Sequence, residues 1–217
     1  MSGVDGFLAP VLTEVLLTGL ARLRSEGPGA HLYIGSAWLS NFPLFPGVFA
    51  GSFPYLLPET EPGDVATIAD VVSTWRLHGG AVTVLVQNYD KFDWPRKDDA
   101  RANAEEFQLL KRCLEAGSEV LFGKGFHSKF IVCPDVVISG TANMTYSGYY
   151  RNMEQIHVYR SHGSASDYAS ERAVCLNHVA TAFGLGLCLP EHFTGQLLLN
   201  NLGALEQYIA SALQLPS

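Results

Sequence analysis

A histidine and a lysine separated by one residue, His127 and Lys129, are the side chains of this sequence best suited to chemistry. They lie in an apolar segment that predicts a strand, where residues two apart point to the same side. A histidine can act as a nucleophile, or as a general acid and base near neutral pH. A lysine supplies a positive charge for a phosphate-like anion. The pair therefore favours chemistry on a phosphate ester.

A second group of polar residues follows the strand that is predicted to form a hairpin with the first. Small residues at its end, Gly140 among them, let a substrate approach the backbone. The Thr141 hydroxyl and the Asn143 amide are hydrogen-bond donors suited to phosphate oxygens. Glu154 comes at the start of the next predicted strand, where a carboxylate can orient a histidine ring through its second nitrogen.

This pattern resembles the phospholipase D superfamily. The family signature is a histidine and a lysine separated by one residue, an aspartate five residues after the lysine, then Gly-Ser-x-Asn, and a glutamate about eleven residues later. The residues that match are His127, Lys129, Gly140, Thr141, Asn143 and Glu154, the last of them eleven residues after Asn143. Thr141 takes the place of the usual serine and keeps the hydroxyl.

The hairpin is one residue shorter than the family spacing, so Asp135 comes six residues after Lys129 instead of five, beside Pro134. Shortening a hairpin at its tip leaves its base in place, so the histidine, lysine and asparagine can still converge. We therefore interpret Asp135 as a turn former and leave it out of the predicted catalytic set.

The sequence contains one such motif, because no other histidine is followed by a lysine two residues later. The family needs two motifs per active site, from duplicated halves or from two chains. A single-motif chain of this size resembles the nuclease-like branch, in which a homodimer builds one site across a two-fold axis. The resemblance further implies a phosphohistidine intermediate, with no metal and no cofactor.

The leading hypothesis is a metal-independent phosphodiesterase, most simply an endonuclease that hydrolyses DNA. Two alternatives stay open: a phospholipase or other hydrolase of small phosphodiesters, and a non-catalytic subunit that binds nucleic acid or assembles a bacterial DNA-processing or defence complex. A net charge of −7 and a pI near 5.4 argue against binding nucleic acid by bulk charge. They suit a nuclease that other proteins of a multi-subunit system recruit.

The composition is that of a globular protein with a sizeable core, since 47% of the 217 residues are hydrophobic and 16% are charged. The four cysteines show no paired spacing, which predicts free buried thiols and no zinc site. The N-terminus lacks a basic segment, and Pro10 and Glu14 interrupt the apolar stretch over 7–23. We therefore expect no membrane span and a cytoplasmic location.

Helices alternate with strands along the chain. Helices are predicted over 7–25, from Asp64 to about His78, over 100–116 and from Ser166 to about Phe183, and the tail over 190–215 is predicted to be largely helical. Strands are predicted over 31–39, 81–89, 119–122, 128–133, 136–139 and 155–159. The alternation predicts an α/β fold, a layered α/β/α sandwich around a mixed sheet.

We expect a catalytic domain over residues 1–185 and a C-terminal helical extension over 186–217 that packs on the domain or on a dimer partner. The domain includes a loop over 41–62 that is rich in proline and aromatic residues. Packing on the parent core, a partner contact and a lid beside the site all remain open for this loop.

Overall fold

The computed structural model describes residues 8–44, 66–88, 100–182 and 196–213. Within them, seven strands form one mixed sheet in the order β6-β5-β4-β1-β2-β3-β7. The strands are β1 (His31–Ser36), β2 (Ala81–Gln87), β3 (Glu119–Gly123), β4 (Lys129–Cys133), β5 (Val136–Gly140), β6 (Ile156–Arg160) and β7 (Gln196–Leu199). The helices are α1 (Ala9–Glu26), α2 (Ile68–Leu77), α3 (Ala100–Glu115), α4 (Tyr146–Tyr150), α5 (Ala165–Ala182) and α6 (Leu202–Leu213).

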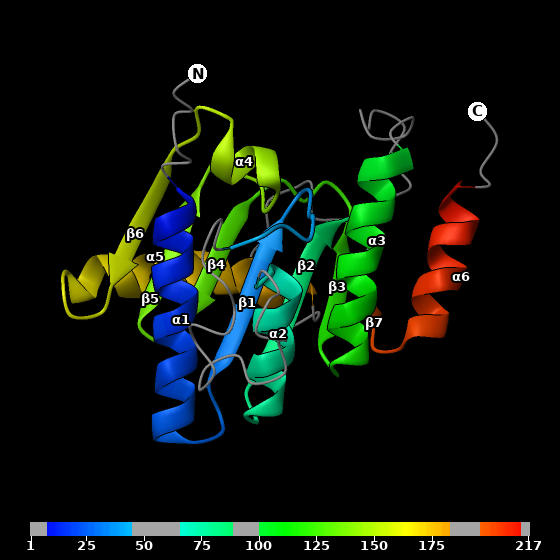
Figure 1. Ribbon diagram of the computed structural model, residues 1–217. Helices are drawn as coiled ribbons and strands as arrows, with labels where there is room; N and C mark the ends of the chain where they lie inside the picture. Colours follow the sequence, from blue (N-terminus) through cyan, green and yellow to red (C-terminus); the bar gives the residue numbers. More distant parts are fainter. Residues whose placement is uncertain (1–7, 45–65, 89–99, 183–195, 214–217) are drawn as a thin grey trace.

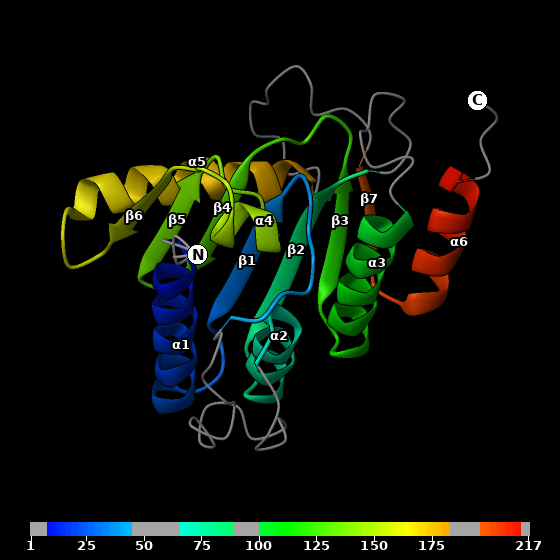
Figure 2. The ribbon, with the colours of Figure 1, turned by 45° about the horizontal axis from the view of Figure 1, so that its top comes forward.

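The helices form layers on both faces of the sheet, which confirms the predicted α/β/α sandwich. Helices α1, α2 and α3 cover one face and α5 crosses the other, as Figures 1 and 2 show. Strands β1, β2 and β3 run parallel, connected by α2 and α3. Strand β4 pairs antiparallel with β1, and β4, β5 and β6 form an antiparallel meander. The sheet is therefore parallel at its centre and antiparallel at both sides.

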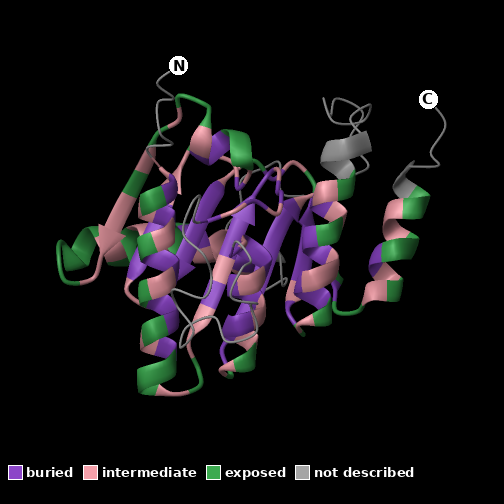
Figure 3. Ribbon diagram, in the orientation of Figure 1, coloured by how far each residue is buried: buried purple, intermediate pink, exposed green. Residues whose placement is uncertain are grey.

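Two apolar cores lie on the two faces of the sheet. The larger one, under α1, α2 and α3, includes the buried Leu12, Trp75 and Leu110. The smaller one, under α5, joins Phe126 and Phe130 to Cys175. Figure 3 shows that buried residues concentrate on the central strands and on the helix faces turned toward them. The long apolar runs of the sequence thus become strands that are covered on both sides.

Several boundaries differ from the sequence predictions. Helix α2 starts at Ile68, because Thr67 caps it in a capping box with Asp70, and Asp64 lies outside the described residues. Helix α5 starts one residue before Ser166, and the hydroxyl at its start that accepts the Asp167 N–H belongs to Ser164. The short helix α4 was not predicted.

The C-terminal tail is not as helical as predicted, because β7 pairs antiparallel with β3 in the same sheet. Helix α6 follows and packs on this domain through Tyr208, whose ring lies 4.6 Å from that of Phe122. The predicted division at residue 185 falls within 183–195, outside the described residues.

Most of the 41–62 loop also lies outside the described residues, but Phe42 and Leu44 at its start are buried in the larger core. The three described cysteines, Cys113, Cys133 and Cys175, are buried free thiols as predicted. None of the described helices has the length and the apolar character needed to cross a membrane.

A glycine in β1 leaves room for an aromatic ring of β4. A Cβ at Gly35 would lie 2.4 Å from two ring atoms of Phe130, and this buried ring packs edge-to-face on Phe126 and stacks on His178. We predict that Gly35→Ala lowers the free energy of unfolding by about 1–3 kcal/mol, because the ring cannot move freely. Denaturant unfolding of the two proteins measures the difference.

The matched control is Gly163→Ala on the exposed turn before α5, where the nearest atom would be 3.4 Å from the new Cβ. It should change the free energy of unfolding by less than about 0.5 kcal/mol. Equal effects of the two substitutions would contradict the packing described for Gly35.

Candidate active site

The predicted site residues gather at one edge of the sheet, the edge next to α4 in Figure 1. Strand β4 begins there at Lys129, which pairs with Gly140 at the end of β5, and Gly140 pairs in turn with Ile156 at the start of β6. Strand β1 ends at the same edge, since Gly35 pairs with Phe130 in antiparallel register. Sheet pairing thus brings together groups that are far apart in the sequence.

His127 and Lys129 lie side by side, as their spacing predicts. The Lys129 Nζ is 2.9 Å from Nδ1 and 3.1 Å from Nε2 of His127, and it donates a hydrogen bond of 2.6 Å to the His127 carbonyl oxygen. Ser128 between them points to the opposite side, where its hydroxyl is 3.2 Å from Nε2 of His178 on α5. The two side chains therefore share one side of the chain, although His127 comes just before β4 begins.

The two side chains differ in burial. His127 is exposed, whereas Lys129 is only 8% exposed. Burial lowers the pKa of the Lys129 amine to about 8, and the negative charge of Glu154 opposes part of that effect. The site thus combines an accessible imidazole with a buried amine whose charge changes near neutral pH.

Glu154 binds the threonine of the motif. The Thr141 hydroxyl donates to Oε2 of Glu154 at 2.6 Å, and Asn152 donates to Oε1 at 3.3 Å. The Thr141 hydroxyl also accepts the Gln155 N–H at 3.0 Å. A phosphate oxygen would have to replace Glu154 as the acceptor for the Thr141 hydroxyl. The role of Glu154 in orienting the histidine stays a prediction.

At Gly140, the chain that enters β6 lies close against β5. A Cβ at this position would lie 2.1 Å from the Gln155 carbonyl oxygen. The sequence interpretation assigned this glycine to substrate approach, but the contact within the sheet already requires it. Contact of Gly140 with a substrate phosphate stays a prediction.

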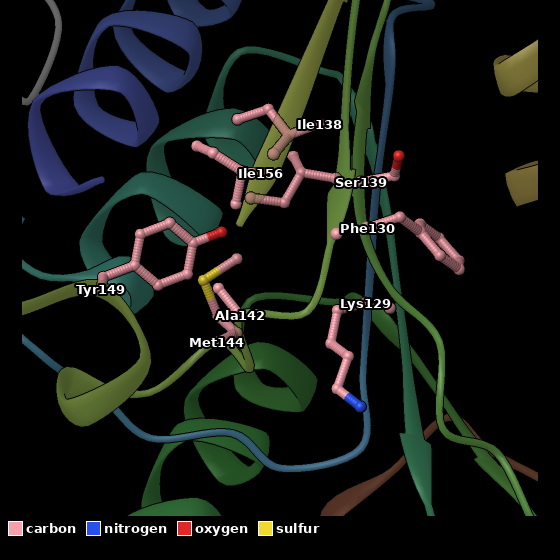
Figure 4. A pocket seen from close by; sticks show the side chains of 11 residues that line it. Lys129, Phe130, Ile138, Ser139, Ala142, Met144, Tyr149 and Ile156 are labelled. Carbon is pink, nitrogen blue, oxygen red and sulfur yellow. The ribbon is translucent and has the colours of Figure 1, made fainter. Parts of the chain in front are cut away.

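Asn143 follows on the same edge and is held from the β1 side. Its Oδ1 lies 3.5 Å from the Ser36 hydroxyl, and its carbonyl oxygen accepts the Thr145 N–H at 2.7 Å. Figure 4 shows the pocket between these elements, with Ala142, Met144 and Tyr149 on one side and the Lys129 side chain pointing away from them. The amine, the histidine and the asparagine thus lie on adjacent elements at one edge.

Comparisons with known proteins identify the family of the chain. The model of the family described as "Cardiolipin synthase, PLD-like domain" matches residues 54–173, more than half of the chain. The chain belongs to the phospholipase D-like family. No curated protein matches the sequence.

Among the solved structures that are similar to this chain, three have sequence identities of 11–12%. The phospholipase D family member Nuc from Salmonella typhimurium has 12% identity and a TM-score of 0.39, with 70% of this chain and 83% of that chain covered. NucT from Helicobacter pylori has 11% identity and a TM-score of 0.43, with 76% and 87% covered. Polyphosphate kinase from Porphyromonas gingivalis has 12% identity and a TM-score of 0.49, with 89% of this chain and 27% of that chain covered.

Asp135, at the position nearest the family aspartate, lies at the other end of the hairpin. It comes two residues after Cys133, the last residue of β4. Cys133 lies four residues after Lys129, a separation of about 13 Å along a strand. Its carboxylate forms an ion pair with Arg22 of α1 and accepts the Ser161 hydroxyl at 3.0 Å. Asp135 therefore ties the hairpin tip to α1, and its exclusion from the catalytic set stays a prediction.

Three tyrosines follow the motif, and the structure separates their roles. Tyr149 is buried, and burial raises the pKa of its hydroxyl. The Tyr150 hydroxyl donates to the Pro43 carbonyl oxygen at 2.8 Å. Tyr146 is 40% exposed, stacks on Tyr150 at 4.8 Å and lies 5.0 Å from the Arg151 guanidinium. Tyr146 and Arg151 thus form an exposed aromatic and cationic surface close to Asn143.

Two buried polar residues near the site, Ser36 and Glu106, were missed by sequence reasoning. Ser36 ends the apolar strand β1 and Glu106 lies on α3. A serine at the end of a buried strand was a weak signal, and nothing in the spacing of Glu106 relates it to the motif. Among the described residues, no three His, Cys, Asp or Glu side chains come together as metal ligands.

We predict that the Lys129 amine titrates near pH 8, because burial disfavours its charged form. Glu154→Gln should lower this midpoint further, since it removes a negative charge that favours the ammonium. Carbon-13 NMR of lysines labelled at Cε measures both midpoints, and the Lys129 signal is assigned by its loss in Lys129→Arg. Above the midpoint the positive charge is lost, so binding of inorganic phosphate should weaken as the pH rises through about 8.

Glu171→Gln, the same change on α5 at the opposite face, serves as the control and should leave the Lys129 midpoint in place. A midpoint near the ordinary value of 10.5 in the unmodified protein would show that the amine is not buried as described.

Proposed function

We propose that the chain is a phosphodiesterase that hydrolyses nucleic acid, most simply a DNA endonuclease, at a site built from two copies of this edge. The observation that carries the proposal is the pairing of an exposed histidine with a buried lysine whose Nζ is 2.9 Å away, with Asn143 at the same edge of the sheet. We call His127, Lys129, Thr141, Asn143 and Glu154 the half-site. Membership of the phospholipase D-like family supports the same chemistry.

In the first step, a ring nitrogen of one His127 attacks phosphorus and forms a P–N bond. The bond from phosphorus to the leaving oxygen breaks, and the partner's His127, as imidazolium, gives that oxygen a proton. In the second step, the partner's His127 takes a proton from water. The water oxygen bonds to phosphorus, the P–N bond breaks, and both histidines return to their starting states.

The two roles of histidine are the reason for two copies. One ring cannot be bonded to phosphorus and protonate the leaving group at the same time. In the proposed dimer, a lysine and an asparagine from each copy surround the non-bridging oxygens and supply the charge stabilisation that a metal ion would otherwise give. The exposure of His127 supports this arrangement, because an exposed ring is open to a second copy.

The surface next to the half-site supports nucleic acid as the substrate. The exposed Tyr146 and Arg151 lie between Asn143 and Glu154 in the sequence, and the Arg151 guanidinium over the Tyr146 ring offers a surface on which a base can stack. The net charge of −7 gives no general attraction to DNA, so the proposal includes recruitment by partner proteins.

We predict that His127→Ala lowers cleavage of DNA and of a chromogenic phosphodiester by at least about a thousandfold, because it removes both nucleophile and acid. EDTA should leave the cleavage by the unmodified protein unchanged. The control is His157→Ala, which removes an exposed histidine on β6 and should retain full activity.

Full activity of His127→Ala would remove the site from consideration. Inhibition by EDTA that magnesium reverses would instead remove the metal-independent mechanism. Cleavage of phospholipid vesicles without cleavage of nucleic acid would transfer the proposed substrate to lipids.

We predict that activity depends on pairs of intact chains. After equal amounts of unmodified protein and His127→Ala exchange subunits, activity should be about one quarter of that of the same total amount of unmodified protein, because only pairs with two histidines turn over. A mixture with His157→Ala should keep full activity. An activity of about one half would show that each chain works alone.

A further inference from the structure

The chain beyond β1 runs beside the segment that carries Asn143. In this β1 extension, residues 37–40, the Ser40 N–H donates to the Met144 carbonyl oxygen at 2.9 Å. The Ser36 hydroxyl accepts the Met144 N–H at 2.9 Å, and the Ser40 hydroxyl accepts the Tyr146 N–H at 3.2 Å. Leu39 and Met144 form a parallel bridge. The segment that follows Asn143 is therefore fixed to the end of β1 and to the β1 extension.

The backbone of Asn143 is also confined on its other side. A Cβ at Gly148 in α4 would lie 2.3 Å from the Asn143 carbonyl oxygen, so the helix packs directly against that peptide. Asn143 thus lies between the β1 extension and α4. A shift of the extension would move Asn143 with it, because Ser40 holds Met144, the next residue, by a backbone hydrogen bond.

A buried carboxylate holds the β1 extension from the side of α3. Glu106 is 1% exposed, and its Oε1 accepts the Leu39 N–H at 3.0 Å. Successive N–H groups of an extended chain point to opposite sides. The Leu39 N–H therefore points to α3, whereas the Ser40 N–H points to Met144. The extension is clamped between the Glu106 carboxylate and the Asn143 segment.

A glutamate at this buried position carries a free-energy cost. Burying a carboxylate costs free energy unless hydrogen bonds compensate it, and an apolar side chain would serve packing alone. The carboxylate thus holds the Leu39 N–H at hydrogen-bonding distance from α3, which packing alone would not do.

We propose that Glu106 is a positioning residue of the half-site: its carboxylate fixes the β1 extension, and the extension fixes Asn143. The inference rests on the proposed function. It assigns a role to a side chain on α3, distant in sequence from every residue of the motif. Glu106 acts through the backbone of Leu39 and Met144 and does not touch the substrate.

Two substitutions separate the hydrogen bond from the packing. Glu106→Leu removes the acceptor and should lower kcat by about tenfold to a hundredfold, since a displacement of about 1 Å at a reacting group has effects of this size. Glu106→Gln keeps an acceptor oxygen and should stay within about threefold of the unmodified kcat. Glu106→Met, which has the length of glutamate without an acceptor, takes the place of Glu106→Leu if that variant does not fold.

A double-mutant cycle with Asn143→Ala tests whether the effect passes through Asn143. In the Asn143→Ala background, Glu106→Leu should cause no further loss of kcat, because the group it positions is already gone. The control is Leu114→Ala, a buried position farther along α3, which should lower the melting temperature without changing kcat. Additive losses from Glu106→Leu and Asn143→Ala would overturn the proposal.

Hydrogen exchange tests the clamp without any activity measurement. Glu106→Leu should speed exchange of the Ser40 and Met144 amides at least tenfold more than Leu114→Ala does, and Glu106→Gln should not. Equal exchange in Glu106→Leu and Leu114→Ala would overturn the positioning role. If the unmodified protein cleaves no phosphodiester, the proposed function fails, and the exchange result alone then decides whether the clamp exists.

Discussion

The antiparallel pairing of β4 with β1 and β5 decides where every group of the half-site lies. Because β4 runs opposite to its two neighbours, its first residue, Lys129, meets the ends of β1 and β5. The meander then returns through β6, so Glu154 arrives at the same edge just before that strand begins. Had β4 paired parallel to β1, its first residue would lie at the opposite edge from the end of β1, and Ser36 and Lys129 could not be neighbours.

The half-site combines groups in very different surroundings within a few residues. Lys129 is buried and its pKa is lowered to about 8, mainly by that burial, whereas His127 two residues earlier is exposed. A buried amine beside a carboxylate keeps its position with little freedom, and an exposed imidazole can meet a ligand. Lys129 is buried within the sheet, whereas His127 is exposed in the irregular segment just before β4.

Much of this arrangement could be predicted from local sequence, and some of it could not. The spacing of His127 and Lys129 and the apolar runs around them predicted the hairpin, at whose other end the structure places Asp135. By contrast, the hydrogen bond from the Leu39 N–H to Glu106 joins residues 67 positions apart in the sequence, and the one from the Met144 N–H to Ser36 joins residues 108 positions apart. No periodicity reports such contacts, because they arise only when helices and strands pack. The start of α2 was missed because Thr67, not Asp64, has the acidic partner three residues later.

Both the family motif and the packing of the backbone require a glycine at position 140. The family motif places a glycine there beside the groups that would hold a phosphate, and the close approach of the Gln155 carbonyl oxygen leaves no space for a side chain. A mutational scan that measures activity alone would therefore assign Gly140 a catalytic role. The same loss of activity would result if side chains at this position only prevented the two backbones from packing. Separating the two requires abundance and turnover to be scored in parallel, so that a collapsed strand is not mistaken for a missing functional group.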